Sequence, residues 1–187
     1  TKAAFEQWLD SLAAAEQQAI RVVSMDMWDP YRRAVRAKLP HAQIVADRFH
    51  VMKHLTHQID LLRRALQKKA APALYALLKG QRWLLIKNRQ DLKPEEEATL
   101  RQILAASAEL RVLYLLKEEF RTICERIQDK AQAERFLQAW LWKATTTGSR
   151  YLLRFVQTLR HWWPEFLNYF EDRVTQGFVE GINRAIR

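Results

Sequence analysis

The chain has 187 residues, of which 49% are hydrophobic, enough for the core of one domain with or without an insertion, and this excludes a wholly disordered protein. Only 4 Gly and 5 Pro argue against an all-β fold with many tight turns, and a single cysteine excludes an intrachain disulfide and a cysteine-built zinc site. A formal net charge of +10 favours an anionic partner, most often a nucleic acid.

Two short apolar segments, each followed by an aspartate, lie in the first third of the chain. Apolar residues at helical spacing predict an amphipathic helix over 3–19, and the β-branched run 20–25 predicts a buried strand that ends at Asp26. A basic helix and a second strand over 43–46, ending at Asp47, follow. We interpret this order as a βαβ-like unit with both acids at the carboxyl ends of its strands, where open α/β sheets bind their ligands.

From residue 49 onward the pattern predicts helices almost without interruption. The helix over 49–70 carries an apolar stripe, and Pro94 followed by three glutamates predicts a helix start that the helix dipole stabilises. The other predicted helices cover residues 72–79, 108–128, 131–146 and 149–172. A last helix, from about 175, carries Glu180.

Basic residues are concentrated beside the two strand-end acids, since residues 30–69 hold ten basic and two acidic side chains. A basic surface around a carboxylate site suits a polyanionic substrate, although a solvated basic helix face explains this segment equally well. The residues for which we predict DNA binding are Arg32, Arg33, Arg36, Lys38, Arg48, Lys53, Arg63, Arg64 and, on the last helix, Arg184.

Asp26, Asp47 and Glu180 are candidates for a functional site, and for each of them a purely structural role is the alternative. A carboxylate such as Asp26, directly after an apolar strand, must be paired, hydrogen-bonded or metal-bound, and a capping or turn aspartate would satisfy this too. For Asp47 the alternative is an ion pair with a neighbouring base. Glu180 shares a helix face with Asn183 and lies beside Gly181, which costs a helix roughly 1 kcal/mol relative to Ala. That cost indicates a close approach by another group, and tight helix packing is the alternative.

Histidines and tryptophans are also candidates for binding. His50, His54 and His57 share one helix face at a spacing that metal ligands use, but Lys53 beside them disfavours a cation. We therefore interpret them as a solvated or phosphate-facing stripe. The seven tryptophans are expected to lie mostly in the core, with stacking on bases as the alternative for some.

Three motifs together resemble a known family. They are Val-Val-Ser-Met-Asp-Met at 22–27, the stretch 39–51 with its Asp-Arg-Phe-His, and the stretch 167–183 with its Gly-Phe-Val-Glu-Gly-Ile-Asn. In this order they resemble the DDE transposases of bacterial insertion sequences, in the ISL-three family, over almost the whole chain.

The resemblance implies an α/β, ribonuclease-H-like fold, of which this chain would hold a mostly helical part. Residues 1–69 would be a partial core with the fourth and fifth strands, 70–172 a long helical insertion, and 173–187 the helix that carries the catalytic glutamate. Asp26 and Glu180 match two of three acids that hold two Mg²⁺ ions and catalyse DNA strand cleavage and transfer during transposition. The possible accessory residues are Asp47, which matches a motif but not one of the three ligands, His50 and Asn183.

The resemblance also has departures. The first catalytic aspartate would lie upstream of Thr1, and the cysteine-rich and helix-turn-helix DNA-binding regions of the family are absent. Thr-Gln-Gly at 175–177 replaces the usual Thr-Asn-Gly, which leaves that asparagine without a counterpart. We therefore expect a carboxy-terminal fragment of a transposase that binds DNA, with its Mg²⁺ site incomplete, and that does not cleave DNA alone.

Two rival hypotheses stay open. A basic helical module could act only in assembly, and an open sheet edge favours a homo-oligomer in either case. A free-standing nuclease would need a replacement for the absent acid, for which Asp47 or Asp10 could be proposed. No apolar run approaches the ~18 residues of a membrane span and no signal peptide is recognised, so we expect a cytoplasmic, nucleoid-associated protein without a membrane partner.

Overall fold

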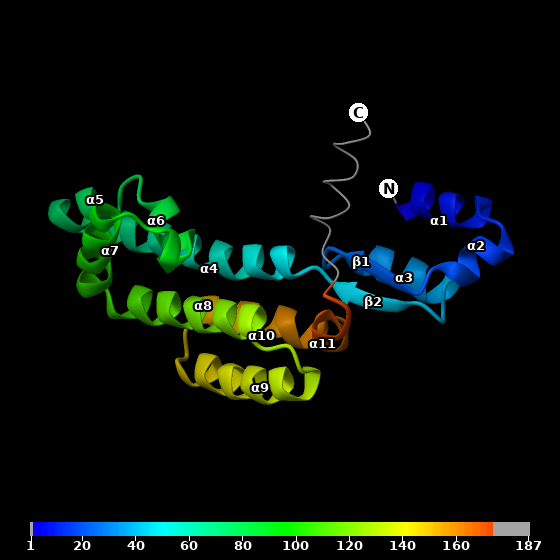
Figure 1. The fold of residues 1–187 in the computed structure, drawn as a ribbon. Helices are drawn as coiled ribbons and strands as arrows, with labels where there is room; N and C mark the ends of the chain where they lie inside the picture. Colours follow the sequence, from blue (N-terminus) through cyan, green and yellow to red (C-terminus); the bar gives the residue numbers. More distant parts are fainter. Residues whose placement is uncertain (1, 174–187) are drawn as a thin grey trace.

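The computed structural model describes residues 2–173, which are mostly helical with two short strands (Figure 1). The first elements are α1 (Lys2–Ser11), α2 (Ala14–Ala19), β1 (Val22–Met25), α3 (Asp29–Lys38), β2 (Gln43–Ala46) and α4 (Arg48–Lys69). The others are α5 (Pro72–Leu78), α6 (Arg82–Ile86), the short 3₁₀ helix η1 (Arg89–Asp91), α7 (Pro94–Ala106), α8 (Ala108–Arg126), α9 (Lys130–Thr146), α10 (Arg150–His161) and α11 (Trp163–Asp172). The predicted last helix, with Glu180, Asn183 and Arg184, lies outside the described residues.

The two strands form the parallel pair that the sequence predicts. Val22 lies opposite Gln43 and Met25 opposite Ala46, and α3 makes the crossover between the strands. Val45 is fully buried, as expected for a strand covered on both faces. The mostly helical composition and the strand–helix–strand order are therefore confirmed.

Two predicted helices are each divided in the structure. The helix expected over 3–19 is broken after Ser11, where the Gln17 amide donates to the carbonyl of Leu9 at 2.9 Å and the Glu16 carboxylate accepts from the amide of Ala13 at 2.7 Å. Side chains thus take over backbone groups that a continuous helix would pair. The helix expected over 149–172 is broken between α10 and α11, because Pro164 lacks the N–H that a helix interior requires.

Four helices surround an aromatic core. Phe120 of α8 contacts Trp140 of α9, Phe155 of α10 and Phe166 of α11, with ring centroids 5.0–5.6 Å apart. These contacts have the tilted or stacked geometries that aromatic pairs prefer, and they join helices that lie side by side in Figure 1.

The expectation that the tryptophans lie mostly in the core is wrong. Only two of the seven are buried, Trp140 and Trp162, and four are exposed. The exposed ones are Trp8, Trp28, Trp83 and Trp142. For Trp83 the sequence pattern cannot decide, because the five-residue helix α6 offers too few turns to define a buried face.

α11 packs against the edge of the sheet. The side-chain amide of Asn168 donates to the carbonyl of Ile44 at 2.9 Å, and Gln43 donates to the carboxylate of Glu171 at 2.5 Å. In a parallel pair, alternate residues face the partner strand, and the amides of Gln43 and Asp47 already bond to β1. Ile44 thus faces the outer edge of β2, and α11 satisfies its carbonyl.

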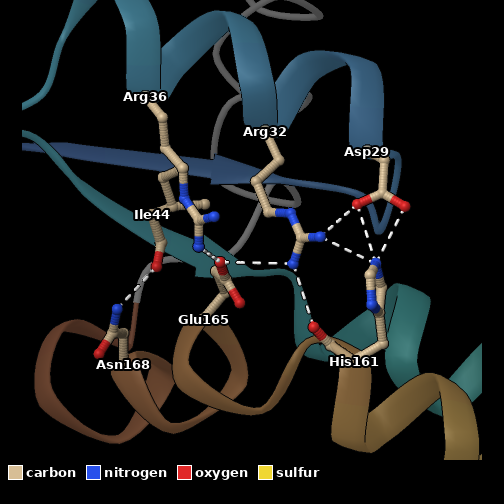
Figure 2. A network of polar contacts seen from close by, with 7 residues as sticks. All are labelled: Asp29, Arg32, Arg36, Ile44, His161, Glu165 and Asn168. Atoms are coloured by element: carbon tan, nitrogen blue, oxygen red, sulfur yellow. Dashed lines mark hydrogen bonds and ion pairs between the residues drawn. The ribbon is translucent and has the colours of Figure 1, made fainter.

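A polar network joins α3 to α10 and α11 (Figure 2). Glu165, only 2% exposed, accepts from Arg36 at 2.5 Å and lies 3.6 Å from Arg32. His161 bonds to both carboxylate oxygens of Asp29, and this hydrogen bond, aided by Arg32, lowers the pKa of Asp29. Basic residues of α3 therefore serve as contacts between the strand layer and the helical layer.

Candidate functional site

The two aspartates of the predicted site follow neighbouring strands. Met25 and Ala46 are paired across β1 and β2, so Asp26 and Asp47 begin the loops that leave the same end of the sheet. The amide of Asp47 donates to the carbonyl of Met25 at 2.8 Å, which ties the two loop starts together. This is the end of a parallel sheet at which ligands bind.

Asp47 is used by the fold itself. Its side chain is 1% exposed and caps α4, accepting from the amide of Phe49 at 2.9 Å, while its second oxygen lies 3.2 Å from Nδ1 of His50. A cap of this kind satisfies a helix N–H that would otherwise be unpaired. Asp47 and His50 thus contact each other, which agrees with the structural alternative for Asp47, an ion pair with a neighbouring base.

Asp26 has a different environment. It is half-buried and lines an open groove of about 830 Å³. Within residues 2–173 its carboxylate accepts no hydrogen bond and forms no ion pair, its charge acts on His54, and its backbone carbonyl accepts from the amide of Trp28. Asp26 is therefore the strand-end carboxylate whose oxygens are available to a ligand in this part of the chain.

The groove is built by three helices that are distant in sequence. The first turns of α4 contribute one wall. α6 contributes Arg82 and Trp83, the loop after it contributes Asn88, and α8 contributes Arg121 and Glu125. Cationic and imidazole side chains outnumber the two carboxylates, Asp26 and Glu125, that line it. Such a groove raises the local concentration of anions.

Three histidines of α4 line this groove, in agreement with the prediction that they share one face of the helix. His50, His54 and His57 all belong to its wall. Desolvation by the groove walls lowers the pKa of His54, and the positive charges of His57, His50 and Lys53 lower it further, while Asp26 raises it. Across residues 2–173 no three His, Cys, Asp or Glu side chains converge as a metal site needs, so the alternative of a histidine zinc site finds no support there.

The arginines and lysines predicted to bind DNA fall into two groups. Five of them make ion pairs. Arg32 pairs with Asp29 and Glu165, and Arg36 also pairs with Glu165. The other pairs are Lys38 with Asp10, Arg48 with Glu125 and Arg63 with Asp60. Arg33, Lys53 and Arg64 are exposed, and Arg184 lies outside the described residues. Within residues 2–173, Arg33, Lys53 and Arg64 make no ion pair, whereas Arg63 is buried and also donates to the carbonyl of Leu78.

Sequence reasoning missed the wall opposite α4 and the buried charge that supports it. Lys117 of α8 is fully buried and donates to the carbonyls of Leu85 at 3.1 Å and Lys87 at 2.8 Å, at the end of α6. Burial lowers the pKa of Lys117, while its ion pair with Glu118 at 2.7 Å opposes this. A lysine within the apolar run of α8 is a signal that sequence analysis could have used.

The sequence as a whole matches one family of proteins. The family model for ISL3 DDE transposases, described as "Transposase", matches residues 1–187. The chain belongs to the ISL3 family of transposases. The strand–aspartate pattern that the structure displays is therefore part of a transposase, and the resemblance drawn from the three motifs is confirmed.

Relatives with curated names agree with this family. The chain is 31% identical over 189 residues to the transposase for insertion sequence element IS1001 of Bordetella parapertussis, covering 100% of this chain and 45% of that protein. It is 27% identical over 210 residues to the transposase for IS1557 of Mycobacterium tuberculosis, covering 100% of this chain and 47% of that protein. The chain thus spans less than half the length of these relatives. No solved structure matches it.

Proposed function

We propose that this chain is the part of an insertion-sequence transposase that holds two of three metal-binding acids, Asp26 and Glu180, and that it binds DNA along the groove. One observation carries the proposal. Asp26, at the end of a parallel strand, presents a carboxylate without a described partner to a groove lined by basic side chains. The family supports DNA as the substrate, because transposases act on DNA.

The metal in this proposal fits the donors that the chain offers. Asp26 supplies a hard carboxylate oxygen of the kind Mg²⁺ prefers, and Glu180 would supply a second. When bound, two divalent ions would lower the pKa of an attacking water or 3′-hydroxyl and stabilise the leaving oxygen at phosphorus. Asp26 and Glu180 would hold the ions, and Lys53 and Arg82 in the groove wall would hold the phosphates of the strand.

We further propose the division of the chain that the family implies. Residues 1–69 would contribute two strands to a ribonuclease-H-like core, 70–172 would be the helical insertion, and 173–187 would carry Glu180. The helices from α5 to α11 are consistent with such an insertion, because they form a continuous helical layer that rejoins the strands through α11. The motifs in this chain match two of three catalytic acids, so we expect no DNA cleavage by the chain alone.

Metal binding tests the role of Asp26 without relying on activity. Isothermal titration with Mn²⁺ is expected to show binding that D26N weakens at least tenfold, because the variant loses a charged ligand. D47N is the matched control, since Asp47 follows the neighbouring strand but serves as a helix cap. Equal Mn²⁺ affinity of the D26N variant and the parent chain would contradict the proposed ligand.

DNA binding and cleavage test the rest. A 20-base-pair duplex is expected to bind with an affinity that falls steeply with salt, and K53A should reduce the salt slope by about one, because each phosphate contact releases counterions. The control is R111A, on the exposed face of α8 away from the groove. A nicking assay with Mg²⁺ or Mn²⁺ should show no turnover, and turnover abolished by D26A would overturn the proposed need for a third acid.

A further inference from the structure

We propose that the groove holds an unpaired stretch of DNA, whose bases stack on Trp83 and Phe49. This inference rests on the proposed function and deepens it, because it states which form of DNA the site takes. The groove lining combines exposed aromatic rings with cations, and this combination suits single-stranded DNA better than a duplex.

The two aromatic side chains are exposed although the fold has a core to bury them in. Trp83 of α6 is 68% exposed and Phe49 of α4 is 65% exposed, and both line the groove. Exposing rings of this size to water is unfavourable, since each could bury a large apolar area. A stacking partner that arrives from solution would recover that free energy.

Charged groups of the groove are placed for the backbone of the same strand. The guanidinium of Arg82 lies 5.2 Å from the ring centroid of Trp83, and Lys53 projects from the facing helix without an ion pair within residues 2–173. Arg82 also lies 3.9 Å from the carboxylate of Asp60, but its side chain stays 54% exposed, whereas Arg48 and Arg121 are less exposed and pair with Glu125. One aromatic platform therefore has an adjacent cation for a phosphate, which is the arrangement that single-strand binders use.

The groove runs along α4, and both aromatic side chains, Phe49 and Trp83, line it. On α4 the lining runs from Arg48, beside the strand end, to His57, a helical rise of about 14 Å. α6 packs against α4 (Figure 1). Trp83 of α6 and Asp26, which follows β1, both line the groove. A strand lying in the groove would thus reach Asp26 after passing an aromatic ring.

Only unpaired bases can use these rings. In a duplex each base face is covered by its neighbours in the stack, so a side chain reaches a face only after the base has left the helix. Lys117 donates hydrogen bonds to the carbonyls of Leu85 and Lys87 at the end of α6, and these bonds hold in place the helix that carries Trp83. An anchored platform stacks with less loss of conformational entropy than a flexible one.

A pair of tryptophan variants tests the inference. We would measure binding of fluorescein-labelled dT20 and of a 20-base-pair duplex by anisotropy, for the parent chain, W83L and W142L. Trp142 of α9 is 68% exposed as well but does not line the groove, so it matches Trp83 in residue type and exposure. W83L should weaken dT20 binding roughly 5- to 100-fold and duplex binding much less, and W142L should change neither.

The outcomes separate this inference from the proposed function. Equal losses for the W83L and W142L variants, or equal losses on dT20 and duplex, would overturn stacking while leaving DNA binding in place. No salt-dependent binding of either DNA would overturn the proposed function itself. F49L provides a second test, since leucine keeps the helix start and removes only the ring, and it should also weaken dT20 binding selectively.

Discussion

At the scale of single residues, Asp26 and Asp47 show how two aspartates after neighbouring strands come to differ. Asp47 is enclosed and bonded to Phe49 and His50, whereas Asp26 faces the groove. Replacing Asp47 by alanine removes the cap and should lower the free energy of unfolding by about 1–2 kcal/mol. D47N keeps an oxygen that accepts from Phe49 and should cost clearly less. Urea unfolding followed by circular dichroism measures both, and equal losses for the two variants would show that the charge, not the cap, matters.

Lys117 is a charged residue whose replacement tests a buried contact. Its ammonium bonds to two backbone carbonyls and pairs with Glu118, so K117M leaves the two carbonyls unpaired in the interior and leaves Glu118 with Arg121 as its partner. We expect a loss of about 3–5 kcal/mol in the free energy of unfolding. The matched control is K143M, which breaks the exposed pair of Lys143 with Glu119 and should cost at most about 1 kcal/mol. Similar small losses for both variants would mean that Lys117 adds little to the fold.

At the scale of elements, local signals predict what short segments do by themselves. The β-branched run before Asp26 predicts a strand, and its pairing with the run before Asp47 follows because parallel strands need a helical crossover. The break before α11 was missed although Pro164 signals it, since a periodic apolar stripe continues through the break. The groove could not be predicted, because Trp83 and Arg121 reach it only through tertiary packing.

The contact of α11 with β2 is the element-scale contact that we expect to matter most for stability. N168D would place a carboxylate against the carbonyl of Ile44, where the amide now donates, and should lower the free energy of unfolding by about 1–3 kcal/mol. Q157E makes the same chemical change on the exposed side of α10 and should stay within about 0.5 kcal/mol of the parent chain. Denaturant unfolding of both variants gives the comparison, and a neutral N168D would show that α11 docks without this bond.

At the scale of the whole molecule, a net charge of +10 does not mean ten free cations. Arg32 and Arg36 join α3 to α11 and Arg63 joins α4 to α5, so they add less to DNA binding than their number in the sequence implies. Of the predicted DNA-binding residues that the structure describes, Arg33, Lys53 and Arg64 are exposed and make no ion pair there, and only Lys53 of these lines the groove. Every helix within residues 2–173 is too short or too polar to cross a bilayer.

We expect His54 to make both stability and DNA binding depend on pH, in opposite directions. Desolvation, with the charges of His57 and His50, lowers the pKa of His54. Because the folded chain then binds fewer protons than the unfolded chain, the stability that His54 contributes is lost as the pH falls below about 6.5. Phosphates in the groove have the reverse effect, since they favour imidazolium, and DNA should therefore bind more tightly as the pH falls.

This pH dependence can be measured by anisotropy between about pH 7.5 and 5.5 at constant ionic strength. If bound DNA raises the pKa of His54 by about one pH unit, affinity rises by up to about tenfold over that range. H54Q should reduce the rise, because it removes the titrating group from the groove wall. The control is H41Q, since His41 is exposed and bonds to the carbonyl of Gln17 away from the groove. Parallel pH profiles for the H54Q variant and the parent chain would exclude His54 as the source of the proton uptake.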